Sequence, residues 1–141
     1  MDITKSTKRG LWYFAHPYTC KDSNGEYVSE GEEANFNICN IRSAELLMRG
    51  YNIYSPISHT HPIHRACPAF LARKEHELWY HLDNEFIDKV DWSGIILAPE
   101  WKKSAGCRAE AQRISARGKS VLFYSDIIAE VTEKEIEDED Y

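Results

Sequence analysis

The chain has 141 residues, 43% of them hydrophobic and 28% charged, a balance that predicts one folded domain and excludes a disordered protein. The formal net charge is −6, but much of it lies in the C-terminal stretch EVTEKEIEDEDY, so the rest of the chain is close to neutral. Because Lys and Arg form no basic stripe, binding would release few counterions, and we expect no nucleic-acid polymer as a partner.

The N-terminus and the cysteines indicate the compartment. The stretch MDITKSTKRG lacks the apolar core of a signal peptide, and no apolar run is long enough to span a membrane. The cysteines are widely spaced and form no C-x-x-C pair, which leaves disulfides open but favours neither them nor a zinc site of the usual pattern. They are Cys20, Cys39, Cys67 and Cys107. We therefore expect a cytoplasmic protein with reduced thiols, without membrane association and without a cofactor.

The first half of the chain alternates short apolar runs with polar turns. In chain order it predicts a strand over 11–15, an exposed loop over 18–29, a helix over 30–49, a strand over 52–55 and an irregular, histidine-rich segment over 58–68. Continuous apolar runs are typical of strands that are buried on both faces. Pro17 and Pro56 follow the two strands, and Gly50 ends the helix.

The second half continues the alternation. It predicts helices over 69–81 and 83–90, a strand over 93–98, a helix from Ser104 to Gly118, a strand over 120–124 and an acidic appendage from about 130. On local grounds Asp83 is the N-cap of its own helix. Strands alternating with helices predict a doubly wound α/β domain, a Rossmann-like or flavodoxin-like three-layer sandwich around a parallel sheet. We find no internal repeat and no domain boundary, so residues 1–141 form one domain.

Polar side chains gather where the predicted strands end. Ligands of an open parallel sheet bind beyond the carboxyl ends of its strands. The residues at those ends are His16, Pro17 and Tyr18 after the first strand, Pro56, Ser58, His59 and His61 after the second, and Glu100, Trp101, Ser104 and Gly106 after the third. Glu110 lies about a turn and a half into the next helix, too far for a capping role, and is expected to face the same cleft.

The turn from Ser104 to Gly106 offers backbone N–H groups, a hydroxyl and the positive end of a helix dipole, a combination that suits a phosphate. The simpler interpretation is a plain serine N-cap. Glu110 taken by itself is more often a solvated helix residue than a catalytic one. Trp101 is a core or rim residue by default, although it lies where a base could stack.

The histidine-rich segment allows a metal hypothesis. His59 and His61 form a His-x-His pair that can chelate zinc, and His64 follows. Pro62 and the loop context supply no second half of such a motif. We therefore favour histidines that line a pocket or hydrogen-bond its loops, and we expect no metal site.

Three stretches then carry a family resemblance. They are WYFAHPY at the first strand, LDNEFIDKVDWSGIILAPEW in the middle and SAGCRAEAQRISARGKSV at the last helix. Over residues 11–124 they resemble the nucleoside 2-deoxyribosyltransferase family, in particular its branch of deoxynucleoside 5′-monophosphate N-glycosidases and CMP hydrolases. SPISHTHP also resembles a deoxyribosyltransferase-like group of bacteria and phages. The matching positions are Tyr13, Asp83, Asp91 and the S-x-G-x-x-x-E pattern from Ser104 to Glu110.

The resemblance implies cleavage or transfer of an N-glycosidic bond. Glu110 would attack or stabilise the anomeric carbon as the base leaves, because the transition state resembles an oxocarbenium ion. Asp83 would hydrogen-bond the sugar or orient Glu110, and Tyr13 would approach the same carboxylate. Hydrolysis of a nucleoside 5′-monophosphate is favoured over transfer to an acceptor base.

The resemblance also implies how the rest of the substrate is bound. Ser104 and Gly106 would hold the 5′-phosphate, while His59 and His61 would contact the base or act as a general acid. Two positions depart from the family. His16, followed by Pro17, replaces a small glycine or serine turn. Arg108 replaces a small residue and could reach the phosphate or a neighbouring subunit.

Two further expectations concern assembly and class. This family commonly completes its cleft from a partner, so the resemblance implies a homodimer or a higher homo-oligomer. The alternative to an enzyme is a nucleotide sensor that keeps the pocket without turnover. The presence of both Glu110 and Asp83 favours the enzyme.

Overall fold

The structure, a computed structural model, describes residues 9–67 and 75–130. Its centre is a four-stranded sheet in which every pair of neighbours is parallel, in the order β2-β1-β3-β4. The strands are β1 (Leu11–Ala15), β2 (Ile53–Tyr54), β3 (Trp92–Leu97) and β4 (Ser120–Phe123). This arrangement confirms the predicted α/β sandwich. The strand order is that of flavodoxin-like folds, with a topological switch between β1 and β3.

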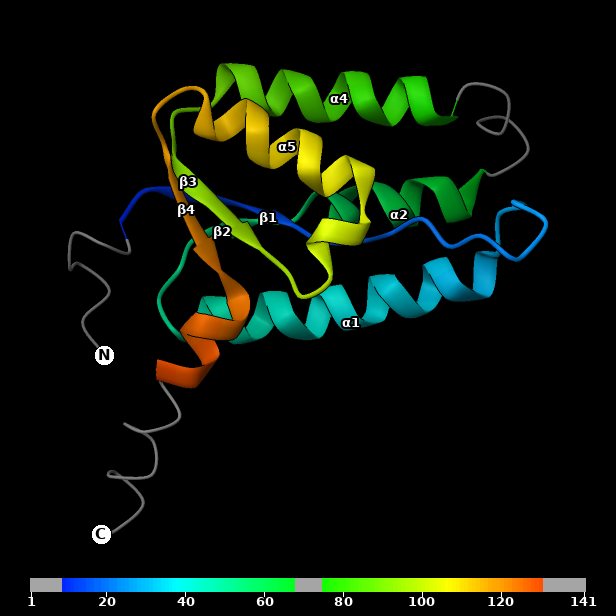
Figure 1. The fold of residues 1–141 in the computed structure, drawn as a ribbon, viewed down its shortest axis with the longest axis horizontal. Helices are drawn as coiled ribbons and strands as arrows, with labels where there is room; N and C mark the ends of the chain where they lie inside the picture. Colours follow the sequence, from blue (N-terminus) through cyan, green and yellow to red (C-terminus); the bar gives the residue numbers. More distant parts are fainter. Residues whose placement is uncertain (1–8, 68–74, 131–141) are drawn as a thin grey trace, which may run out of the picture.

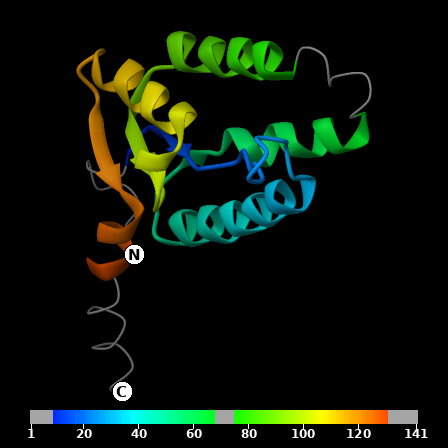
Figure 2. The same ribbon diagram turned by 45° about the vertical axis from the view of Figure 1, so that its right-hand side comes forward.

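Helices cover both faces of the sheet (Figure 1). On one face lie α1 (Ser29–Met48) and a short helix over 124–130, and on the other lie α4 (Glu75–Lys89) and α5 (Ala105–Ser115), as the turned view in Figure 2 also shows. The helix α2 (Pro56–Ala66) follows β2 and contacts both α1 and β1. A short 3₁₀ turn, η2 (Trp101–Lys103), leads from β3 into α5.

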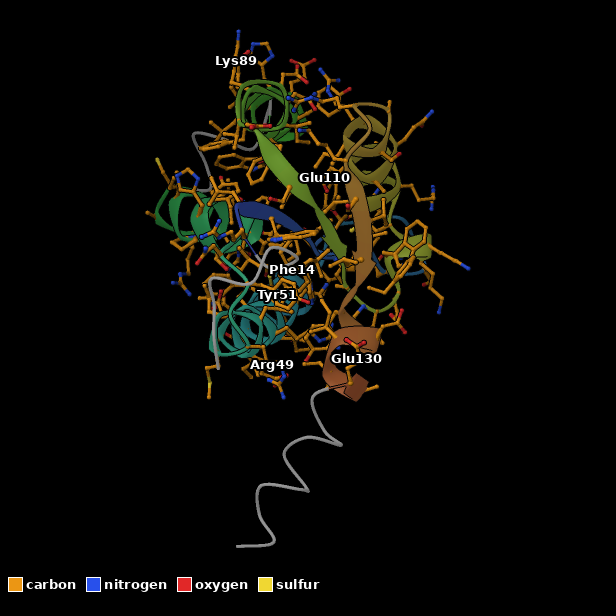
Figure 3. All side chains as sticks on the ribbon, turned by 90° about the vertical axis from the view of Figure 1, so that its left-hand side faces the viewer. Phe14, Arg49, Tyr51, Lys89, Glu110 and Glu130 are labelled. Carbon is orange, nitrogen blue, oxygen red and sulfur yellow. The ribbon has the colours of Figure 1, made fainter. Side chains whose placement is uncertain are left out.

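Alternation along β1 divides the core into two layers. Trp12 and Phe14 pack toward α1, whereas Tyr13 and Ala15 pack toward α4 and α5. Side chains of a strand point to opposite faces at every step, so this parity determines which helices Tyr13 meets. In Figure 3 Phe14 and Tyr51 accordingly lie on the α1 side of the sheet, and Glu110 lies on the α5 side.

The predicted break at Asp83 is wrong. A single helix, α4, runs through Asp83, so this residue is not an N-cap. No Gly or Pro interrupts the helix, and Ile87 of α4 is fully buried while Phe86 packs against the same layer. Tertiary packing of that face outweighs the local capping preference of an aspartate. The expected helix over 69–81 lies partly outside the described residues.

The irregular segment expected over 58–68 is also wrong, because residues 56–66 form α2. Ser55 caps this helix by accepting a hydrogen bond from the amide N of Ser58 (3.4 Å), and Pro56 occupies the first turn, where its missing N–H costs nothing. Pro62 lies inside the helix and removes one backbone hydrogen bond without ending it. Residue 68 and the acidic stretch after Glu130 lie outside the described residues.

The cysteines and the helices bear on the expected compartment. All four cysteines lie in the described part of the chain and are free thiols. Within residues 9–67 and 75–130, no helix combines the length and the apolar character needed to cross a bilayer.

Candidate functional site

A cleft of about 1680 Å³ opens at the carboxyl edge of the sheet. Its walls come from the loop after β1, from α2 and from the facing parts of α4 and α5. Of the predicted site residues, the lining includes His16, His61, Asp83, Ser104, Gly106 and Glu110. The edge and the topological switch therefore coincide with a real cavity, as expected for an open parallel sheet.

Tyr13 and Glu110 meet on the α5 side of this cleft. The Tyr13 hydroxyl donates a hydrogen bond to Oε2 of Glu110, joining β1 to α5. Tyr13 is fully buried, and burial together with the negative charge of Glu110 raises the pKa of its hydroxyl well above the ordinary value. The phenol therefore stays protonated and remains a donor to the carboxylate.

Asp83 brings a second carboxyl group to the same place from α4. Its Oδ1 atom is buried and has no hydrogen-bond partner among the described residues, and burial raises the pKa of Asp83 to about 7. Burial also raises the pKa of Glu110 to about 8, with a further increase from the charge of Asp83 that the Tyr13 hydrogen bond opposes. The pair therefore holds a proton near neutral pH.

Ser104 begins α5 at the mouth of the cleft. Its Oγ accepts a hydrogen bond from the amide N of Cys107 (3.2 Å), so the serine is an N-cap as predicted. A Cβ added at Gly106 would meet only Ser104 Oγ, at 3.9 Å, which means that the space beside this turn is open. The first amides of a helix lack intrahelical acceptors and can bind an anion here.

The comparisons with known proteins bear on the family. A family model described as "Domain of unknown function (DUF1937)" matches residues 10–126. The chain belongs to the DUF1937 family. No curated protein matches it. Tyr13, Asp83, Ser104 and Glu110 all fall inside the segment that this family defines.

His16 of the DUF1937 chain is a buried, neutral wall residue. Its Nε2 lies 2.9 Å from Nη1 of Arg42, and its Nδ1 lies 2.8 Å from the carbonyl oxygen of Pro17. Because a guanidinium only donates, Nε2 must accept and the Nδ1 proton points to Pro17. Burial, assisted by the Arg42 charge, lowers the pKa of His16. His16 therefore shapes the cleft without supplying a proton.

Besides the buried Tyr13, His59 and three other residues singled out in the sequence lie outside the cleft lining of the DUF1937 protein. His59 is exposed and its Nδ1 lies 2.9 Å from the Tyr54 hydroxyl. The ring centroid of Trp101 lies 6.2 Å from that of Phe123. Arg108 donates a hydrogen bond to the backbone carbonyl of Lys102 at 2.5 Å. Asp91 forms an ion pair with Lys119 at 2.9 Å. The structure does not bring these side chains to the Tyr13–Glu110 pair.

Sequence reasoning missed two residues beside the cleft lining of the DUF1937 protein, Tyr54 and Glu33. Tyr54 of β2 lies near the carboxyl pair. Burial raises the pKa of its hydroxyl most, and the negative charges of Asp83 and Glu110 raise it further. Tyr18 and Glu33 form a hydrogen-bonded cluster with His61. The place of Tyr18 directly after the first strand indicated that it would lie at this edge of the sheet. Nothing in the sequence indicated this for Glu33, which lies in the helix α1.

The histidines of α2 do not assemble a metal centre with neighbouring ligands. Across the described ranges, no group of three or more His, Cys, Asp or Glu side chains is arranged to hold a metal ion. His61 and His64 instead share the hydroxyl of Tyr18.

Proposed function

We propose that this DUF1937 protein cleaves the N-glycosidic bond of a nucleoside 5′-monophosphate, releasing the free base and a sugar phosphate, or transfers the sugar to another base. The observation that carries the proposal is the Tyr13–Glu110 hydrogen bond beside Asp83, whose buried Oδ1 has no partner among the described residues, at a cleft that Asp83, Ser104 and Glu110 line. The motif resemblance to nucleoside 2-deoxyribosyltransferases supports the same reaction.

Glu110 would face the anomeric carbon. As the C1′–N bond breaks, positive charge develops on the sugar, and a carboxylate beneath C1′ lowers the barrier electrostatically or by forming a covalent intermediate that water then hydrolyses. Tyr13 holds Oε2 of Glu110 and so orients the other oxygen, Oε1, toward the substrate. A hydrogen bond from a buried phenol also stabilises the anionic form that this step needs.

Asp83 would complete the sugar site. Its buried Oδ1 needs a partner, and a sugar hydroxyl supplies one on binding. Two neighbouring carboxyl groups resist ionising together. With pKa values of about 7 for Asp83 and about 8 for Glu110, Asp83 ionises first, and Glu110 becomes the anion that the reaction needs as the pH rises further. In this proposal Asp83 binds the sugar and Glu110 acts at C1′.

A screen of the common nucleoside 5′-monophosphates, with and without an acceptor base, tests this proposal by chromatography of the released base. Release without an acceptor supports hydrolysis, and release only with an acceptor supports transfer. A protein that binds these nucleotides and cleaves none of them would instead be a nucleotide sensor, the alternative function.

Ser104→Ala tests the phosphate site. We expect binding of a nucleoside 5′-monophosphate to weaken by about 1.5–3 kcal/mol, the contribution of one hydrogen bond to a charged group, with little change for the matching nucleoside. Ser104→Asp is the control, since it keeps an N-cap acceptor but repels a phosphate. Calorimetric titration of each variant with both ligands measures the difference. Equal losses for nucleotide and nucleoside would remove Ser104 from phosphate binding.

We also propose that the protein forms a homo-oligomer. Four large apolar side chains of α1 are exposed in the single chain, Ile38 (41%), Ile41 (61%), Leu47 (53%) and Met48 (76%). Burying such side chains against a second copy removes apolar surface from water. We expect light scattering to give at least a dimer at micromolar concentration, and Ile41→Glu to lower that mass. A wild-type monomer at that concentration would contradict the proposal.

A further inference from the structure

A second polar cluster lies in the cleft, on the wall formed by α2 and the loop after β1. The Tyr18 hydroxyl is 2.6 Å from Nδ1 of His61 and 3.2 Å from Nδ1 of His64. Nε2 of His61 is hydrogen-bonded to Oε2 of Glu33, whose other oxygen accepts a hydrogen bond from Arg65 at 2.7 Å. Residues from the β1 loop, α1 and α2 are thus connected in series.

The chemistry of each group determines where the protons lie. Glu33 is ionised, because the hydrogen bond from His61 and the charge of Arg65 lower the pKa of its carboxyl group. A carboxylate only accepts, so Nε2 of His61 carries a proton. Nδ1 of His61 then either accepts from Tyr18 or, when the ring is an imidazolium, donates to the Tyr18 oxygen. In the second state the Tyr18 proton is free to point to His64 or to a bound ligand.

Packing holds this series in place. His61 is only 5% exposed, and its ring centroid lies 4.4 Å from that of Phe36. Nδ2 of Asn35 donates to the backbone carbonyl of Tyr18 at 2.9 Å and fixes the loop. A tyrosine whose hydroxyl is held by a buried histidine, itself oriented by a carboxylate, has the arrangement of a proton-transfer chain.

We propose that Tyr18 is the general acid that protonates the departing base, and that His61 and Glu33 are positioning residues that supply its proton. This inference rests on the proposed N-glycosidic cleavage. As the C1′–N bond breaks, its electron pair passes to the base, and a base nitrogen takes the Tyr18 proton. The Tyr18 oxygen takes the proton from Nδ1 of His61. The His61 ring is then neutral, and a proton from solvent restores the imidazolium. Glu33 stays ionised throughout.

The placement of the two clusters suits such a division of work. Glu110 and Asp83 reach the cleft from α5 and α4, while Tyr18 and His61 reach it from the loop after β1 and from α2. A substrate between them would present its sugar to the carboxyl pair and its base to Tyr18. In the free protein His64 offers the Tyr18 proton an acceptor, and the bound base takes that place.

Tyr18→Phe, assayed on two kinds of substrate, tests the proposal. The first is the nucleoside 5′-monophosphate that the wild type cleaves, and the second is a 4-nitrophenyl ribofuranoside or 2-deoxyribofuranoside 5-phosphate, whose leaving group departs as a stable anion without protonation. We expect kcat to fall at least roughly 10²-fold on the nucleotide, the usual size of general-acid catalysis, and to stay within about threefold on the nitrophenyl substrate. Glu33→Gln should show the same selective loss, smaller in size.

Tyr124→Phe is the matched control, because it removes a hydroxyl that donates to Glu45 at 2.5 Å outside the cleft lining, and its rates should equal those of the wild type on both substrates. An equal fall of Tyr18→Phe on both substrates, or no fall on either, would overturn the proposal. If Glu110→Gln abolishes both activities in that case, the proposed function still stands. A wild type that cleaves neither substrate would overturn both proposals together.

Discussion

Glu110→Gln lowers the rate of N-glycosidic cleavage at least about 10²-fold, we expect, and leaves nucleotide binding largely intact. Glutamine keeps the shape of the side chain and removes the charge that an oxocarbenium-like centre needs, and loss of one preorganised electrostatic partner typically has this size. The Tyr13 hydroxyl still finds an oxygen acceptor in the amide. Single-turnover rates measured on the cleaved nucleotide give the comparison.

Two measurements separate this effect from misfolding. The increase in Tm produced by a saturating nucleoside 5′-monophosphate should survive in Glu110→Gln, because the substitution leaves the phosphate turn untouched. Glu85→Gln, at an exposed position of α4, is the matched control and should cleave at the wild-type rate. A Glu110→Gln variant that cleaves normally would show that Glu110 takes no part in the chemistry.

The cleavage rate of the nitrophenyl substrate, whose leaving group needs no proton, should rise with pH across the neutral range. Glu110 acts as an anion, and its pKa is raised to about 8, so below that value the active fraction falls roughly tenfold for each pH unit. Tyr13→Phe removes the hydrogen bond that lowers the pKa of Glu110 and should move this acidic limb to higher pH. A limb that stays in place in Tyr13→Phe, or a rate that falls as pH rises, would contradict the assigned protonation state.

The same shifts predict how stability depends on pH without any substrate. In the folded protein Glu110 and Asp83 bind protons more tightly than their ordinary values of 4.5 and 3.8 imply, with pKa values of about 8 and about 7. Their protonated forms therefore stabilise the fold fully below pH 3.8, and this contribution is lost as pH rises to about 8. Denaturant unfolding should show a smaller decline between pH 5 and 8 in Glu110→Gln than in the wild type.

Much of the fold and part of the site follow from local sequence. The short apolar runs around Tyr13, Ile53, Ile95 and Val121 are confirmed as strands of one parallel sheet. The rule that ligands bind at the carboxyl edge then placed Ser104 and Glu110 at a cleft that the structure contains. These elements can be predicted because a strand buried on both faces is a continuous apolar run, and a helix N-cap is usually a small polar residue such as serine.

Elements in which a local sequence preference conflicts with tertiary packing could not be predicted in this way. The histidine-rich segment over 58–68 was expected to be irregular, yet α2 runs over 56–66, and Asp83 suggested a helix start inside α4. In both places the packing of one helix face outweighed a local preference worth about 1–3 kcal/mol.

The sequence by itself determined the sheet, the cap at Ser104 and the presence of two carboxyl groups near one edge. Only the tertiary structure decided that Tyr13 reaches Glu110, that Tyr18 meets His61 and Glu33, and that His59 and Trp101 turn elsewhere. The reason is physical: the direction of a side chain depends on strand parity, helix phase and the partners that packing supplies, and those partners come from segments far apart in the chain.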